Sequence, residues 1–304
     1  MQAQNPARRH HYVPQFYLRA FAGSDGKLWQ YKREPSGQVS ERQVSPKATG
    51  FEENLYAVRE VATFLPERDP VGIESTFLAS IDDAAAPVHR KLLEEPCPTL
   101  SDAERTAWAT FLNSMLERDL RVIREREDLA PKFTESVTSK LRSRARTMED
   151  LARLDDTLQS LDCEAISLNS VREHMVREIR DPKTLDILQR RGWRLVRLGQ
   201  GPDLVTSDAP LSINAGTDSR PIELLACALS PSCLFVMYPS HWPADQEFKD
   251  LCQSLVLVHN LTMIDGPGRF LYSRDRIVDD DGGRLRAEVE RRFGRARTTG
   301  PFRE

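Results

Sequence analysis

The sequence lacks long apolar runs and a strong excess of charge of one sign. No window approaches the roughly 18 to 20 consecutive apolar residues that a membrane span requires. The 304 residues include 43 lysines and arginines and 46 aspartates and glutamates, for a formal net charge of -3. No overall field therefore draws the chain to nucleic acid or to an acidic membrane, and we expect no membrane partner.

Cysteines are few and show no pairing pattern. There are five, an odd number, and they are widely spaced with no CxxC pair: Cys97, Cys163, Cys227, Cys233 and Cys252. This spacing argues against a disulfide framework and against a zinc ribbon. The stretch from Met1 to His11 is polar and basic, without the apolar segment of a secretory signal. We expect a soluble, cytoplasmic protein.

The common signatures of cofactor and catalytic sites are also missing. The sequence contains no GxGxxG, no P-loop, no HExxH and no GxSxG nucleophile elbow. These absences leave the cofactor and any metal requirement unknown.

The first part of the chain alternates between turns and short strands before it becomes helical. Residues 10–60 read as a β-rich region, in which 27–32 follow a turn signal and alternate apolar with polar side chains. Residues 54–58 are a candidate partner strand. Residues 72–190 read as helical, with an apolar stripe of period three to four. Pro87 lies within this stripe and is expected to kink or divide the first helix.

The rest of the chain predicts an α+β fold. Ser101 to Glu104 has the form of a capping box at the start of a second helix. Its apolar face comprises Trp108, Phe111, Leu112, Met115, Val122 and Ile123, and a further helix is expected over 164–180. Residues 193–275 mix strands, at 193–198, 204–206, 233–238 and 269–273, with a helix over 244–262 whose inward side chains are Phe248, Leu251, Leu255 and Val258.

Because strands and helices are segregated along the chain, we expect a central helical region packed against β-rich N- and C-terminal segments. The sequence does not decide whether the β segments form one sheet or two lobes. We expect one domain over 1–304, with surface tails at 1–9 and 279–304.

The most distinctive segment runs from His10 to Phe21 and contains HxVPxxYLxxF, with His11 as its histidine. It resembles the opening signature of the family called domain of unknown function 4238. Weaker fragments follow in the same order, so the resemblance covers roughly residues 10 to 275. The resemblance implies no established activity. It also implies a glutamate where this chain has Asp82. The weaker fragments are Ile73-Glu74, Phe111 to Arg118, Val205 to Pro210, Leu229 to Pro231, Asn260 and Tyr272-Ser273.

His11 is the first candidate for chemistry. It precedes a Tyr-Val-Pro stretch that must be extended, because the residue before a proline avoids the helical region. A histidine held by rigid flanks can act as an acid, a base or a metal ligand near neutral pH. The alternative is that it bonds a backbone carbonyl and fixes the N-terminal segment. His10 is the weaker candidate.

Arg118 is the second candidate, because it lies in the apolar row of its helix with Phe111 and Met115. A buried arginine needs a carboxylate partner, and Asp208 or Glu74 is expected to supply it. The alternative is a structural ion pair.

Asp208 follows a short strand, where a carboxylate can serve a site or form an Asx turn. Glu74 and Asp82 are eight residues apart, which on a straight helix is about 12 Å of rise and about 80° of rotation. The two carboxylates therefore cannot share one metal, and Asp82 is expected on a solvated face. Asn260, near the end of an apolar helix, is expected to organise a loop.

Two segments, 132–146 and 284–297, are rich in basic residues and could contact phosphates, although a solvated surface is the preferred interpretation. The leading hypothesis is that His11, Arg118 and Asp208, with Glu74, converge on one pocket. Such a set suits hydrolytic or phosphoryl chemistry, for example that of a nuclease or phosphodiesterase. The partner would then be an anionic ligand or nucleic acid. Two alternatives are a non-enzymatic ligand- or partner-binding module and a purely structural polar motif.

Overall fold

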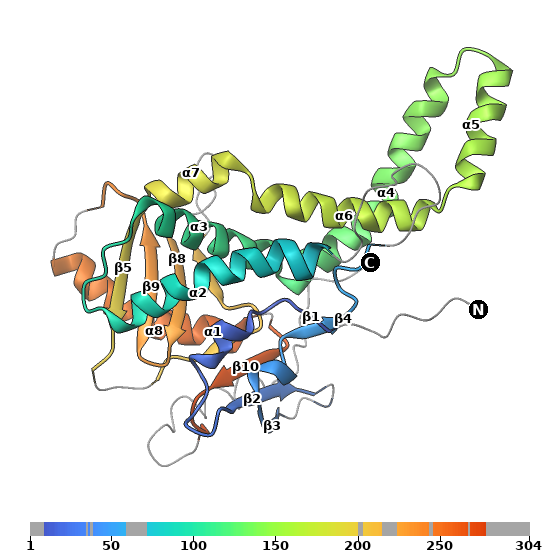
Figure 1. Cartoon of the computed structure of the whole chain (residues 1–304). Coiled ribbons are helices and arrows are strands. Elements are labelled where there is room, and N and C mark those ends of the chain that lie inside the picture. Colours follow the sequence, from blue (N-terminus) through green and yellow to red (C-terminus); the bar gives the residue numbers. More distant parts are fainter. Residues whose placement is uncertain are drawn as a thin grey trace.

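The computed structural model describes residues 9–34, 36, 39–58, 72–199, 203–214, 224–242, 246–266 and 268–277. Figure 1 shows a body of helices and small sheets from which a helical arm projects. The expected tail at 279–304, with its basic segment 284–297, lies outside the described residues, as do residues 1–8. No helix in the described ranges combines the length and the apolar character that a membrane crossing needs.

Strands from the two ends of the chain share one sheet. Its order is β3 (Val39–Val44), β2 (Leu28–Arg33), β10 (Phe270–Ser273) and β6 (Thr206–Ser207), and every pair is antiparallel. The β-rich N-terminal region is therefore joined directly to the C-terminal one. The expected α+β class is confirmed.

The expected pairing of residues 54–58 with β2 is wrong, because β3 and β10 flank β2. Asn54 has φ 56° and begins a turn directly after β4 (Phe51–Glu53). This left-handed conformation ends the extended backbone. Strand β4 instead pairs antiparallel with β1 (Arg9–His11), so that His11 lies opposite Phe51.

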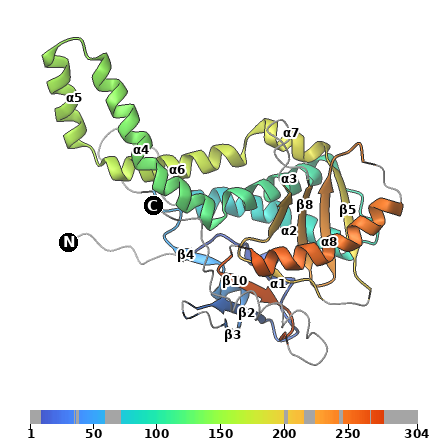
Figure 2. The same cartoon turned by 180° about the vertical axis from the view of Figure 1, so that it is seen from behind.

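The third sheet comes only from the C-terminal half of the chain. Its order is β5 (Gly192–Arg197), β9 (Cys233–Tyr238), β8 (Leu224–Ser230) and β7 (Leu211–Asn214). The side chains of β8 and β9 are buried almost throughout, which explains their continuous apolar sequences. Helix α2 packs on β8 from one face and α8 from the other, as Figures 1 and 2 show.

The first long helix starts with a π-helical segment, η2 (Ile73–Leu78), and continues as α2 (Ala79–Glu94). Pro87 lies within α2 and does not divide it, contrary to one of the two expected outcomes. Its ring is exposed, while Ile81, Val88 and Leu92 are buried and hold the helix on the core.

Helix α3 (Asp102–Glu117) begins with the expected capping box. Ser101 Oγ accepts a hydrogen bond from the Glu104 N–H at 3.3 Å, and Glu104 Oε2 accepts one from the Ser101 N–H at 2.8 Å. The helix ends at Arg118, its C-cap residue. The chain then enters α4 (Leu120–Arg144), so the expected continuous face from Trp108 to Ile123 is divided between two helices.

The remaining helices complete the body and the arm. They are α1 (Gln15–Arg19), η1 (Pro46–Ala48), α5 (Met148–Ser160), α6 (Cys163–Ile179), α7 (Pro182–Arg190) and α8 (Gln246–Asp265). Helices α3 and α4 pack on α6, and α3 also packs on α7.

Helix α8 is rotated from the orientation that its apolar pattern predicts. Leu251 and Val258 are exposed, whereas His259 and Asn260 are buried. Polar contacts fix this rotation. His259 Nδ1 lies 2.9 Å from a serine hydroxyl of β7, and Asn260 Oδ1 accepts a hydrogen bond from the Val205 N–H at 3.0 Å. Asn260 also donates to a backbone carbonyl of the same loop, as expected of a residue that organises a loop.

The N-terminal motif passes through the centre of the core. Tyr12, Val13, Tyr17, Leu18 and Phe21 are all buried. Tyr17 Oη donates to the carbonyl of Ala228 in β8 at 2.8 Å and lies 2.7 Å from the Thr206 hydroxyl of β6.

Gly50 holds the start of the motif in place. Its carbonyl accepts hydrogen bonds from the N–H groups of Tyr12 and Val13 at 2.9 and 3.1 Å. It has φ 65°, and a Cβ at this position would lie 3.0 Å from the Cβ of Val13. A glycine is therefore required both by backbone conformation and by space.

Candidate functional site

Arg118 is buried, with only 1% of its surface exposed, and its partner is Asp82. Its Nη2 donates to Asp82 Oδ1 at 2.9 Å and its Nη1 donates to Asp82 Oδ2 at 3.3 Å, a bidentate pair. Nη2 also donates to Ser114 Oγ at 2.8 Å. The burial predicted from the apolar row is confirmed. The expected partners, Asp208 and Glu74, are wrong.

Asp82 was expected on a solvated face because acids are usually exposed. A straight α-helix separates Glu74 and Asp82 by about 80° of rotation, but η2 has the wider i to i+5 turns of a π-helix. Both carboxylates interact electrostatically with the Arg118 guanidinium. The Asp82 side chain is only 26% exposed, so the expected solvated face is also wrong. Short π-helical turns are frequent at functional sites.

Glu74 is a carboxyl group that carries a proton in part of the molecules at neutral pH. Burial raises its pKa from 4.5 to about 7, and the negative charge of Asp82 contributes in the same direction. A hydrogen bond from the His11 N–H to Glu74 Oε1, at 3.1 Å, and the charge of Arg118 only partly offset this rise in the pKa. Glu74 can therefore act as an acid or a base near pH 7.

The His11 imidazole interacts electrostatically with Asp82 and has one unused nitrogen. Burial lowers its pKa below 6.5, against the effects of a hydrogen bond to the Lys47 backbone and of the charge on Asp82. The ring packs edge-on against Phe51, with centroids 5.6 Å apart. Its Nε2 is buried and has no hydrogen-bond partner among the described residues. A neutral imidazole with a free nitrogen can accept a proton.

Tyr56 contributes a second unused polar atom to the same cluster. Its hydroxyl is buried without a hydrogen-bond partner in the described part of the chain, and burial raises its pKa well above 10. Arg118, Glu74 and Asp82 all act electrostatically on this hydroxyl. His10 stacks on the Tyr56 ring and accepts a hydrogen bond from its N–H, which gives His10 a structural role.

Asp208 belongs to a different cluster. Its carboxylate accepts hydrogen bonds from the Tyr12 hydroxyl and the Phe270 N–H, both at 3.0 Å, and lies 3.8 Å from Arg269. Arg269 also donates to the Tyr12 oxygen at 3.0 Å. Burial raises the pKa of Asp208. This carboxylate ties the N-terminal motif to β10, and its contacts are with Tyr12 and Arg269 rather than with Arg118.

The sequence-predicted set is therefore only partly brought together. Glu74 bonds the His11 N–H and interacts electrostatically with Arg118, whereas Asp208 does not join them. Asp82 and Tyr56 are the members that sequence reasoning missed. Asp82 could have been found from its spacing to Glu74 only by anticipating the π-helix, and no pattern marks Tyr56. Within the described ranges, no three His, Cys, Asp or Glu side chains are placed to share a metal ion.

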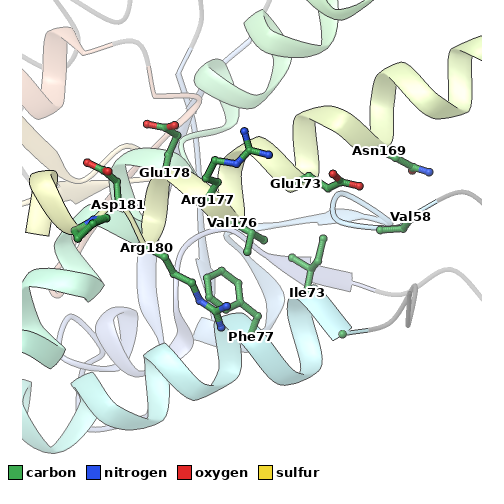
Figure 3. A pocket seen from close by; sticks show the side chains of 12 residues that line it. Val58, Ile73, Phe77, Asn169, Glu173, Val176, Arg177, Glu178, Arg180 and Asp181 are labelled. Atoms are coloured by element: carbon green, nitrogen blue, oxygen red, sulfur yellow. The ribbon is translucent and has the colours of Figure 1, made fainter. Parts of the chain in front are cut away.

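A separate cavity of about 660 Å³ lies between η2 and α6 (Figure 3). Its wall includes Ile73 and Phe77 from η2 and Val176 from α6, and Arg177 and Arg180 lie at its rim. The Arg180 guanidinium lies 4.5 Å from the centre of the Phe77 ring. Arg177 makes no hydrogen bond or ion pair through its side chain with another described residue. The cavity combines an apolar wall with two arginines and three carboxylates, those of Glu173, Glu178 and Asp181.

Comparison with known proteins identifies the family of this chain. Residues 9–276 match the family model described as a protein of unknown function (DUF4238). No curated protein and no solved structure matches the chain. Since the match covers most of the chain, the protein belongs to the DUF4238 family.

Proposed function

We propose that this protein is a hydrolase in which His11 and Glu74 act as the base and the acid. The observation that carries the proposal is the buried, unpartnered Nε2 of His11, a residue whose backbone N–H bonds a carboxyl group with a pKa of about 7. Polar groups with perturbed pKa values and unused hydrogen-bonding capacity are typical of catalytic sites. Arg118, held by Asp82, fixes the charge balance of the cluster.

In the proposed step, His11 Nε2 accepts a proton from water as the water oxygen forms a bond to an acyl carbon. The Tyr56 hydroxyl donates a hydrogen bond to the developing oxyanion. The bond to the leaving oxygen then breaks, and the neutral Glu74 carboxyl gives that oxygen its proton. His11 returns its proton to solvent and Glu74 regains one.

The electrostatics of the cluster favour an uncharged ester over a phosphoester or a nucleic acid. Asp82 already neutralises the Arg118 guanidinium, and Glu74 adds negative charge when it ionises. A phosphate would have to displace Asp82 to reach this arginine. The phosphoester substrate suggested by the sequence is therefore the alternative substrate class within the same proposal.

A substrate panel tests the proposal. Purified protein is assayed with nitrophenyl carboxylic esters, with a nitrophenyl phosphodiester and with single-stranded DNA and RNA, each with and without a divalent metal. His11→Ala and Glu74→Gln should lower kcat on the active substrate by about 100-fold or more, which is typical of a lost acid or base. The activity of the parent protein should fall on both sides of a maximum. It falls at low pH as His11 gains a proton and above about pH 7 as Glu74 loses one.

His174→Ala and Glu125→Gln are the matched controls, because both residues are exposed. They should leave kcat unchanged, and circular dichroism should give the same spectrum for all four variants. The proposal is refuted if the parent protein turns over no substrate faster than the His11→Ala variant does.

The cavity between η2 and α6 supports a second candidate function, the binding of a small carboxylic acid with an apolar body. Ile73, Phe77 and Val176 would contact the apolar part, and Arg177 would pair with the carboxylate. Calorimetric titration with medium-chain fatty acids and aromatic acids tests this function. Arg177→Gln should weaken binding of the acid and leave binding of the corresponding alcohol unchanged. Equal binding of acid and alcohol by the parent protein would contradict it.

A further inference from the structure

Helix α5 and the distal part of α4 form an arm that projects from the body (Figures 1 and 2). None of the 13 residues of α5 is buried, although Leu151, Leu154 and Leu158 give it an apolar stripe of helical spacing. A helix this short is marginal in water and depends on packing for its stability. These three leucines are half-buried, so the described part of the chain covers the stripe only in part.

Helix α4 carries a second exposed apolar row. Leu129, Phe133, Val137 and Leu141 recur every four residues, and Leu129 and Phe133 are 52% and 67% exposed. Ile123 and Ala130 are buried where α4 packs on α6, and Val137, seven residues after Ala130, stands on that same face, so the exposed row is clearest at Leu129 and Phe133. Large exposed apolar rows of this kind mark interaction surfaces.

The two helices of the arm carry opposite charge. Residues 132–146 contain five basic residues and one acid, whereas α5 contains four acids and one arginine. Across the hairpin, the described residues form one ion pair, Arg142 to Asp155 at 2.8 Å. Lys132, Lys140 and Asp156 form no side-chain hydrogen bond or ion pair with any described residue. Of the four acids of α5, Asp155 pairs across the hairpin, Glu149 pairs with Arg153 and Asp150 caps its own helix, so a partner would meet Asp156 and surface ion pairs that can exchange.

We propose that the arm is a dimerisation element that binds the arm of a second copy of this chain. A two-fold arrangement places α4 of each copy against α5 of the other, so that basic and acidic faces meet in both seams. The apolar rows of the two arms then cover one another.

The size of the arm sets the expected affinity. Helix α5 is roughly 20 Å long, and two adjacent helices are roughly 20 Å wide, which gives a face on the order of 400 Å² per copy. Stable interfaces bury about 800 Å² per partner, so the dimer should be weak, with a Kd in the micromolar range. Sedimentation velocity from about 1 to about 200 μM should resolve both species.

Substitution separates this interface from any other. Phe133→Glu should weaken dimerisation at least tenfold. Leu257→Glu is the matched control, because Leu257 is 63% exposed and lies on α8, outside the arm. This variant should dimerise with the same Kd as the parent protein. Dimerisation should also weaken as salt rises, because exposed charge pairs are screened.

A charge exchange gives the sharper test. One variant carries Lys132→Glu and Lys140→Glu in α4, and the other carries Glu149→Lys and Asp156→Lys in α5. Each alone should remain monomeric at about 200 μM, because like charges then meet at the substituted positions of both seams. An equimolar mixture should dimerise, because both seams become complementary again. A parent protein that is monomeric throughout, a dimer that Leu257→Glu disrupts and Phe133→Glu does not, or a mixture that stays monomeric would each overturn the proposal.

Discussion

The stability of the fold should depend on pH through Glu74, and the substitution Glu74→Gln isolates that dependence. Burial raises the pKa of this carboxyl from 4.5 to about 7, so the folded chain binds its proton more tightly than the unfolded chain does. The stabilising contribution of Glu74 to the free energy of unfolding is therefore fully present below pH 4.5 and is lost as pH rises through about 7. A tenfold change in proton affinity is worth about 1.4 kcal/mol, so the loss is about 3 kcal/mol.

Glutamine keeps an oxygen that can accept the hydrogen bond from the His11 N–H and cannot ionise. Relative to the parent protein, the Glu74→Gln variant should gain about 3 kcal/mol in its free energy of unfolding between about pH 4.5 and about pH 8. Urea denaturation at a series of pH values measures the difference. Glu125→Gln is the control, since Glu125 is exposed on α4 and its substitution should give no such trend. A Glu74→Gln curve parallel to that of the parent protein would refute the argument that burial keeps this carboxyl protonated.

Four further changes follow from the contacts described above. Arg118→Met should lower the free energy of unfolding by about 3–5 kcal/mol, because the carboxylate of Asp82 loses its partner; a loss under about 1 kcal/mol in urea denaturation would contradict this. Asp208→Ala should cost about 2 kcal/mol in stability by leaving a buried hydroxyl and N–H unpaired, while kcat of the folded protein stays within about twofold. Burial lowers the pKa of His89 to about 4. Its contribution to the free energy of unfolding is therefore present above pH 6.5 and is lost as pH falls towards 4. His89→Asn should flatten the acid limb of thermal melts, and an unchanged limb would exclude this source. Gly50→Ala should cost more than about 1 kcal/mol, because alanine resists the positive φ; an unchanged Tm would contradict the required conformation.

Local signals in the sequence predicted local structure well. The capping box at Ser101 is confirmed, because it depends on groups only three residues apart. The burial of Arg118 is confirmed, because helical spacing alone places it in an apolar row. The partner strand of β2 was missed. Strand β3 follows β2 as its hairpin partner, but it is largely polar and lacks the apolar alternation that marks a half-buried strand.

The candidate site was harder to predict because its geometry depends on one irregular segment. A regular helix would have separated Asp82 from Glu74 by about 80° of rotation, and nothing in the composition of residues 73–78 marks a π-helix. Asp208 lies at a strand exit, as site residues often do, but its carboxylate is bound by Tyr12 and Arg269. The rotation of α8 was mispredicted for a similar reason, since His259 and Asn260 outweigh its apolar pattern.

The position of the N-terminal motif in the core also affects how the chain folds during synthesis. Tyr12 meets Arg269 across 257 residues, and Tyr17 meets Ala228 across 211. At about 5–20 residues per second, a ribosome needs roughly 10 to 50 seconds to make the later partners. Throughout that interval the tyrosines and Phe21 have no completed core to enter. The nascent chain should therefore be a prolonged client of chaperones that bind aromatic segments, and slower translation should lower the yield of native protein.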